Sequence, residues 1–133
     1  MANTGFFKDS LAGTVGKFSA VGIGQGNGNG STVTQATSKS TGVTLNAISG
    51  KITMNNASLG AGVEAAFTLT NSLIEADDVP VVCVASGGTS ASYGVDVTAV
   101  APGSCEITVS NLSAGSLSEA VVLNFVVVKG AST

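Results

Sequence analysis

The chain has no histidine among its 133 residues, and it has only two cysteines, Cys83 and Cys105. Without histidine there is no Ser–His or Cys–His nucleophilic pair and no imidazole ligand for zinc. The side chain that most often serves as a general base near neutral pH is also missing. Two cysteines cannot complete a structural zinc site by themselves. We therefore expect that the protein is not an enzyme and that it holds no metal and no cofactor.

Charged residues are also scarce, at 10% of the chain, and the formal net charge is −3. Residues 1–30 hold two lysines and one aspartate, a charge of +1, whereas residues 31–133 hold three lysines and seven acids, a charge of −4. A protein that binds nucleic acid needs a basic patch to neutralise phosphates. No such patch is present, so we expect no nucleic acid partner.

Long apolar runs and targeting segments are missing as well. No apolar run approaches the roughly 20 residues of a membrane-spanning helix, so we expect no membrane partner. The N-terminus lacks a basic region followed by an apolar block, and no secretory signal is recognised. Without export, Cys83 and Cys105 are predicted to be buried thiols, although their spacing leaves open a disulfide between adjacent strands.

The densest group of acids is Glu75, Asp77 and Asp78. Three carboxylates offer hard oxygen ligands for calcium, but the spacing does not match an EF-hand loop and no glycine lies inside the group. Glycoside hydrolysis needs two carboxyl groups that face each other across a cleft, and the sequence nominates no such pair. A solvated acidic turn between two strands is the favoured interpretation.

Aromatic residues are few: five phenylalanines, one tyrosine and no tryptophan. Tyr93 falls in an alternating strand, which favours a core or rim position over a sugar-binding role. The buried tryptophan of true immunoglobulin domains is absent.

The first 30 residues differ from the rest of the chain. Their apolar residues recur at spacings of three to four, a weak helical period. Residues 22–30 (GIGQGNGNG) then follow as a Gly/Asn linker, and no window in them fits G-x-G-x-x-G. The apolar arm either anchors the protein on a partner or packs on its own domain. For the first alternative, the predicted anchor residues are Phe6, Phe7, Leu11, Val15 and Phe18.

From residue 31 onward, short alternating segments are separated by Gly, Pro, Asn or Ser. This pattern, with many β-branched residues and little charge, predicts an all-β domain with a hydroxyl-rich surface. We expect an antiparallel β-sandwich, jelly-roll-like, over residues 31–133, preceded by an extended N-terminal arm and linker over residues 1–30. The predicted strands are residues 31–37, 42–46, 51–54, 63–71, 79–85, 92–100, 104–111 and 119–129, with a turn at 49–50.

Alternation within these segments predicts which side chains face the core. Strand side chains point to opposite faces with a period of two. One face of residues 63–71 carries Val63, Ala65, Phe67 and Leu69. One face of residues 92–100 carries Tyr93, Val95, Val97 and Ala99, and in residues 104–111 the inward positions are Cys105, Ile107 and Val109.

The last predicted strand, EAVVLNFVVVK, is apolar on both faces. Val121, Leu123, Phe125 and Val127 form one face, and the opposite face is apolar apart from Asn124. A strand in a two-layer sandwich needs only one apolar face, because the other meets water. We expect a neighbouring subunit to cover the second face. The predicted oligomer interface is Val122, Val126 and Val128, or their counterparts in residues 79–84.

Three segments together resemble small structural proteins of tailed bacteriophages. They are residues 31–57 (STVTQATSKSTGVTLNAISGKITMNNA), 67–72 (FTLTNS) and 107–130 (ITVSNLSAGSLSEAVVLNFVVVKG). The resemblance covers roughly residues 31–130 and leaves out the N-terminal 30. It implies a domain found on virion surfaces, with no catalytic residues to transfer.

The resemblance implies a capsid decoration (cement) protein that sits on the major capsid protein lattice. It further implies a homotrimer at the capsid three-fold sites, assembled in the host cytoplasm. The alternative is a fibre or adhesin module that binds a host glycan or receptor through its loops.

Overall fold

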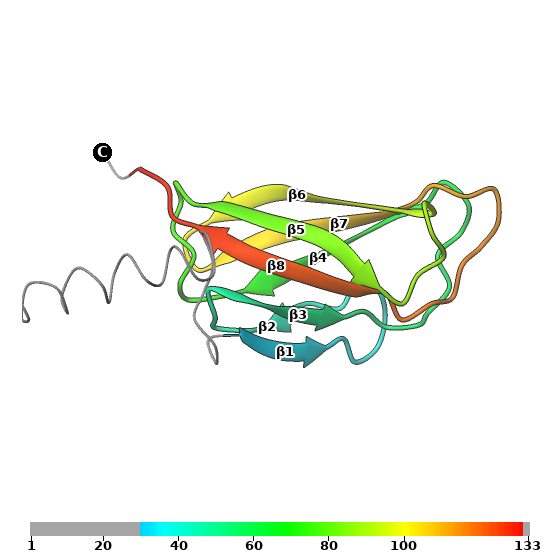
Figure 1. The fold of residues 1–133 in the computed structure, drawn as a ribbon, viewed down its shortest axis with the longest axis horizontal. Helices are drawn as coiled ribbons and strands as arrows, with labels where there is room; N and C mark the ends of the chain where they lie inside the picture. Colours follow the sequence, from blue (N-terminus) through cyan, green and yellow to red (C-terminus); the bar gives the residue numbers. More distant parts are fainter. Residues whose placement is uncertain (1–29, 132–133) are drawn as a thin grey trace, which may run out of the picture.

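The computed structural model describes residues 30–131, which form eight strands and no helix (Figure 1). The prediction of an all-β domain is therefore confirmed for this part of the chain. The strands are β1 (Gly30–Thr34), β2 (Val43–Thr44), β3 (Ser49–Thr53), β4 (Glu64–Thr70), β5 (Val79–Ser86), β6 (Tyr93–Ala101), β7 (Ser104–Asn111) and β8 (Val122–Val128).

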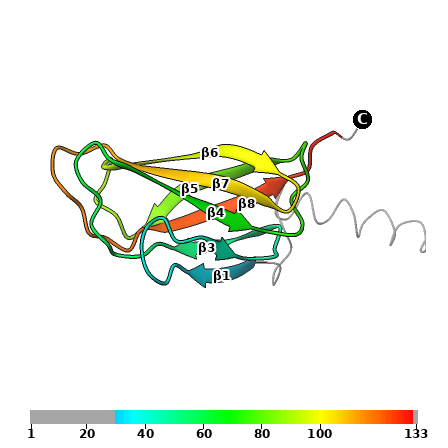
Figure 2. The same ribbon diagram turned by 180° about the vertical axis from the view of Figure 1, so that it is seen from behind.

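The strands build two four-stranded sheets in a sandwich-like arrangement. Sheet A has the order β1-β3-β8-β5, and sheet B has the order β2-β4-β7-β6. Figures 1 and 2 show β8 at the centre of sheet A, with β5 and β6 side by side where the two sheets meet along one edge. The strand predicted to be apolar on both faces thus lies inside a sheet, flanked by β3 and β5.

The strand directions differ in part from the predicted antiparallel arrangement. The central pairs β3–β8, β5–β8, β4–β7 and β6–β7 are antiparallel, but β1–β3 and β2–β4 are parallel. Successive strands from β1 to β4 alternate between the two sheets, so each parallel pair is joined by a crossover through the opposite sheet. Side-chain alternation carries no information on strand direction, which is why the sequence did not reveal these pairs.

The core lies between the inner faces of the two sheets. β8 contributes Val121 from its N-terminal flank together with Leu123, Phe125 and Val127, and all four are buried, as predicted. The inner face of sheet B supplies the residues predicted from alternation in β4 and β7. These buried residues are Ala65, Phe67, Leu69, Cys105, Ile107 and Val109.

Three predicted positions are wrong. Val63 precedes β4 and is 48% exposed. In β6 the register shifts between Val97 and Ala99, so Ala99 is exposed and Val100 packs against the core instead. The predicted turn at residues 49–50 is the start of β3.

Gly50 serves close packing within sheet A. A Cβ atom on this residue would lie 2.7 Å from the Ser31 carbonyl oxygen of β1 and 2.8 Å from a methyl group of Leu45. Only glycine lets the backbone of β1 and the Leu45 side chain approach this closely. Gly50 therefore marks a tight contact between strands and not the turn that the sequence predicts.

Two fully buried asparagines anchor loops at the ends of β4 and β7. Asn71 donates from its side-chain amide to the Ala47 carbonyl oxygen at 2.6 Å. Asn111 donates to the carbonyl oxygens of Leu59 and Gly115, each at 2.8 Å. These bonds satisfy backbone groups that would otherwise be buried without partners.

Candidate interaction surface

The outward side chains of β5 and β8 form an apolar patch on sheet A. In the register of the two strands Val79 lies opposite Val128, and Val81 lies opposite Val126. Val79 is 56% exposed, Val81 49% and Val128 41%, whereas Val126 is half-buried. Directly opposed residues on one face of a sheet contact each other. These four residues, called the valine strip below, therefore form one continuous apolar surface.

The predicted interface residues all lie on this outer face, but they are not all in one group. Val126 and Val128 belong to the valine strip. Val122 is half-buried and lies opposite Thr53 and Ser86, so the pair Cys83–Asn124 separates it from the strip. Val79 and Val81, the other members of the strip, fall within residues 79–84, which were predicted as the counterpart of this interface.

The two cysteines have different environments. Cys105 is buried, as predicted, and burial raises the pKa of its thiol to about 11. Cys83 is exposed on the outer face of sheet A, so the prediction that both thiols are buried is wrong for Cys83. Residues 79–85 are apolar on both sides, and the sequence gives no sign of which side faces water. Both thiols are free, and no disulfide joins them.

The outer face of sheet B is polar and acidic. Glu64, Asp96 and Glu106 lie there among threonine and serine hydroxyl groups. The Thr98 hydroxyl donates to the Glu106 carboxylate at 2.8 Å, and the Ser110 hydroxyl donates to Glu64 at 3.2 Å. The valine strip and the outer face of sheet B thus differ sharply in polarity.

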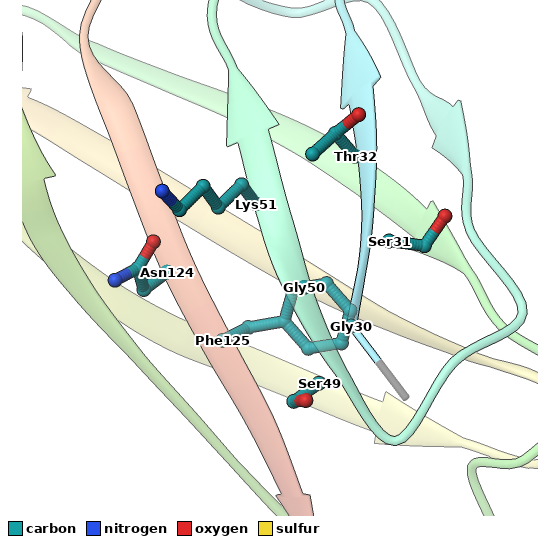
Figure 3. A pocket seen from close by; sticks show the side chains of 8 residues that line it. All are labelled: Gly30, Ser31, Thr32, Ser49, Gly50, Lys51, Asn124 and Phe125. Atoms are coloured by element: carbon teal, nitrogen blue, oxygen red, sulfur yellow. The ribbon is translucent and has the colours of Figure 1, made fainter. Parts of the chain in front are cut away.

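A shallow groove of about 370 Å³ lies across β1, β3 and β8 (Figure 3). Among the described residues that line it, the only charged group is the Lys51 ammonium, and the others present glycine, hydroxyl and amide groups with the Phe125 ring. A catalytic pocket brings several titratable groups together. This groove does not, so it offers no acid–base pair.

The acidic turn before β5 was predicted to be solvated, but one of its three carboxylates is buried. Glu75 and Asp77 are exposed, but Asp78 is buried. The Asp78 carboxylate accepts hydrogen bonds from the Lys129 ammonium at 2.6 Å, the Glu75 backbone N–H at 2.8 Å and the Gly130 backbone N–H at 3.0 Å. These bonds fasten the end of β8 to the turn before β5, next to the pair Val79–Val128.

The Asp78 contacts predict a specific acid sensitivity. The hydrogen bond from Lys129, together with those from the two backbone amides, lowers the pKa of Asp78 to about 2. The pKa of an aspartate in the unfolded chain is about 3.9. The stabilisation of the folded state is therefore fully present above about pH 4 and is lost as the pH falls to about 2. Asp78→Asn is expected to lower the thermal midpoint at neutral pH and to flatten its change between pH 4 and 2. Thermal unfolding followed by circular dichroism across this range measures both effects.

The control for this prediction is Asp77→Asn, which removes an exposed carboxylate from the same turn. It is expected to leave both the midpoint and its pH profile close to those of the wild type. Parallel pH profiles for the wild type and Asp78→Asn would contradict the role of this carboxylate.

A second buried polar network lies at the opposite end of β8. Lys39 is 3% exposed, and its ammonium group donates to the carbonyl oxygens of Asn55 and Glu119, each at 2.6 Å. Burial lowers the pKa of Lys39, and the Glu119 carboxylate partly opposes this effect. The Glu119 carboxylate itself accepts hydrogen bonds from the backbone N–H and the hydroxyl of Thr89. Lys39 is a single lysine in a Ser/Thr-rich stretch, a pattern that is typical of a solvated residue, so the sequence did not predict this network.

Tyr93 packs against the core, as its alternation predicted. A Cβ atom on Gly88 would lie 2.8 Å from the Tyr93 ring, so the ring lies directly against the loop that follows β5. Its hydroxyl group is buried and has no hydrogen-bond partner among residues 30–131. Burial, with a further contribution from nearby Glu119, raises the pKa of Tyr93 to about 12. The ring is therefore not a free platform for stacking on a sugar.

No three His, Cys, Asp or Glu side chains within residues 30–131 are grouped so that they could hold a metal ion. A search of the same residues finds no helix with the length and apolarity to cross a membrane.

The five predicted anchor residues lie outside the described residues. They are Phe6, Phe7, Leu11, Val15 and Phe18. Comparison of the chain with known proteins finds no matching family model, no matching curated protein and no matching solved structure.

Proposed function

We propose that the protein is a virion structural protein: a capsid decoration, or cement, protein that stabilises a phage head by binding the major capsid protein lattice. The observation that carries the proposal is the valine strip, an apolar surface on a domain whose other outer face is acidic and hydroxyl-rich. Contiguous exposed apolar patches mark interaction sites. The phage resemblance supplies the kind of partner.

The two parts of the chain have different tasks in this proposal. The β-sandwich domain, with jelly-roll-like connectivity, associates through the face that carries Val122, Val126 and Val128 into a homotrimer. The N-terminal arm locks onto the shell through its apolar residues. Each contact stabilises the head by burying apolar area at roughly 25 cal/mol per Å², before the cost of ordering the arm.

Deletion of residues 1–30 tests the anchor. The truncated protein is expected to remain a folded oligomer and to lose binding to capsids that lack the decoration protein. Co-sedimentation with such capsids measures binding, and circular dichroism and light scattering verify the fold and the oligomer. Unimpaired capsid binding by the truncated protein would refute the anchor role.

Copy number separates decoration from the alternative fibre or adhesin module. A decoration protein repeats over the whole lattice, so gel densitometry of purified particles is expected to give hundreds of copies per particle. A handful of copies would indicate a fibre instead.

A further inference from the structure

We propose that the pair Asn29–Gly30, where the N-terminal arm meets the β-sandwich domain, is a site of spontaneous deamidation, with Asn27–Gly28 as a second such site. Of the chain's asparagines, only these two are followed by glycine. Residues 27–29 lie outside the described residues, whereas Gly30, whose backbone nitrogen carries out the reaction, is described. The inference goes beyond the proposed function and does not rest on it, because the reaction needs water and no partner.

The reaction joins the backbone nitrogen of Gly30 to the side chain of Asn29. The nitrogen loses its proton to hydroxide and attacks the side-chain carbonyl carbon. The amide nitrogen of the side chain then takes a proton from water and leaves as ammonia, so that a succinimide ring remains. Water adds to one ring carbonyl and breaks the bond from that carbon to the ring nitrogen, which takes up the proton. The product is aspartate, or isoaspartate, in which the main chain runs through the side-chain carbon atoms.

The residue after the asparagine controls how easily the ring closes. Glycine has no Cβ atom, so its nitrogen approaches the neighbouring carbonyl carbon without a steric clash and with the widest choice of backbone angles. Gly30 is exposed and is the first residue of β1, at the edge of sheet A. A Cβ atom on it would meet no atom of residues 30–131 within 4 Å. On its described side, the junction is therefore open to water.

The same reaction is blocked at asparagines inside the folded domain. Asn71 precedes the small residue Ser72 but is fully buried. Its side-chain amide donates to the Ala47 carbonyl oxygen at 2.6 Å, and its side-chain oxygen accepts from the Leu73 backbone N–H at 3.1 Å. Ring closure has to break both bonds in a buried position, which requires that the domain first open. Asn111 is held in the same way.

Deamidation changes both the charge and the backbone at the start of β1. Each event adds one negative charge to a chain whose formal net charge is −3. Isoaspartate also lengthens the main chain by one methylene group directly before the pair Gly30–Ser49, where β1 begins to pair with β3. The remaining pairs of this edge strand follow that position, so we expect the modified domain to stay folded.

Ageing of the full chain in mildly alkaline buffer tests the proposal. Ion-exchange chromatography separates the charge variants, and peptide mapping with isoaspartyl methyltransferase labelling locates the modified residues. Isoaspartate is expected to accumulate at Asn29 and Asn27 several-fold faster than at Asn71, and faster as the pH rises. Ageing in urea is expected to raise the rate at Asn71, which loses its buried hydrogen bonds, and to leave the rate at Asn29 nearly unchanged.

Gly30→Ala is the sharpest variant, because it keeps Asn29 and adds one methyl group in open space. It is expected to slow the reaction at Asn29 several-fold, since the new Cβ atom hinders ring closure. Asn27, whose following glycine is unchanged, is expected to react at the wild-type rate and is the internal control. Asn29→Gln is expected to abolish the reaction at this position, because the longer side chain closes its ring slowly. Circular dichroism verifies the fold of both variants.

Two results would overturn the inference: an aged wild type in which Asn29 reacts no faster than Asn71, or a Gly30→Ala variant that reacts at Asn29 like the wild type. A synthetic peptide that covers residues 24–36 gives the rate without the domain. A much slower rate at Asn29 in the whole protein than in this peptide would show that the junction is shielded, and would overturn the inference as well. Failure of the fresh protein to bind capsids bears on the proposed function alone.

Discussion

Replacing Leu123 with alanine is expected to destabilise the domain by about 2–5 kcal/mol. Leu123 is fully buried in β8, where it lies between Ile52 of β3 and Val84 of β5 in the register of sheet A. The substitution removes three buried carbon atoms and leaves a cavity that the surrounding strands fill only in part. Guanidinium denaturation is expected to show a lower midpoint with an unchanged slope.

The control for Leu123→Ala is Val128→Ala, on the same strand. Val128 points away from the core and is 41% exposed, so its loss is expected to change the stability by less than about 1 kcal/mol. Both variants should be measured at the same low protein concentration, because self-association would raise the apparent stability by mass action. Equal losses for the two variants would contradict the assignment of the two faces of β8.

Replacing Lys39 with methionine is expected to lower the stability by about 2–4 kcal/mol. Methionine keeps the apolar stem of the side chain but cannot donate hydrogen bonds. The carbonyl oxygens of Asn55 and Glu119 would each lose a donor that lies 2.6 Å away. Buried carbonyl groups without a partner retain the full penalty of leaving water. Urea denaturation measures the loss.

The control for Lys39→Met is Lys51→Met, which removes an exposed ammonium group from the outer face of β3. Little change is expected there, since the Lys51 side chain lies in water. A buried ion can sometimes be replaced by an apolar side chain with a gain in stability. A Lys39→Met variant as stable as the wild type would therefore show that the two carbonyl groups find other partners, and that Lys39 does not hold this end of the sandwich together.

The two faces of β8 connect these stability predictions with the proposed function. The inner face, which includes Leu123 and Phe125, holds the sheets together, so its residues determine whether the domain folds. The outer face, which includes Val126 and Val128, contributes little to the single domain. Under the proposed function, this apolar face is covered when the subunits assemble. Separate effects on folding and on association are the expected mark of a structural subunit.

Local features of the sequence were enough to locate the strands and most of the core. The turn at Pro102–Gly103 lies in the break between the predicted strands 92–100 and 104–111, with Gly103 at a φ of 82°, a conformation that glycine adopts easily. The alternation around Phe67, Ile107 and Leu123 assigned their inward faces correctly. Period and turn chemistry act within a few residues, so they can be recognised in one sequence. The two apolar faces of β8 were recognised in the same way.

The contacts between segments that are far apart in the sequence were decided only by the tertiary structure. Lys39 bonds to Glu119 across 80 positions, and Asp78 bonds to Lys129 across 51. The parallel pairing of β1 with β3, and the choice of the β5 face that leaves Val81 and Cys83 outside, likewise depend on how the sheets stack. A polar residue in a turn has the same sequence pattern whether it is solvated or buried. Whether it is solvated or buried depends on which backbone groups the fold places beside it, and that depends on how the sheets pack.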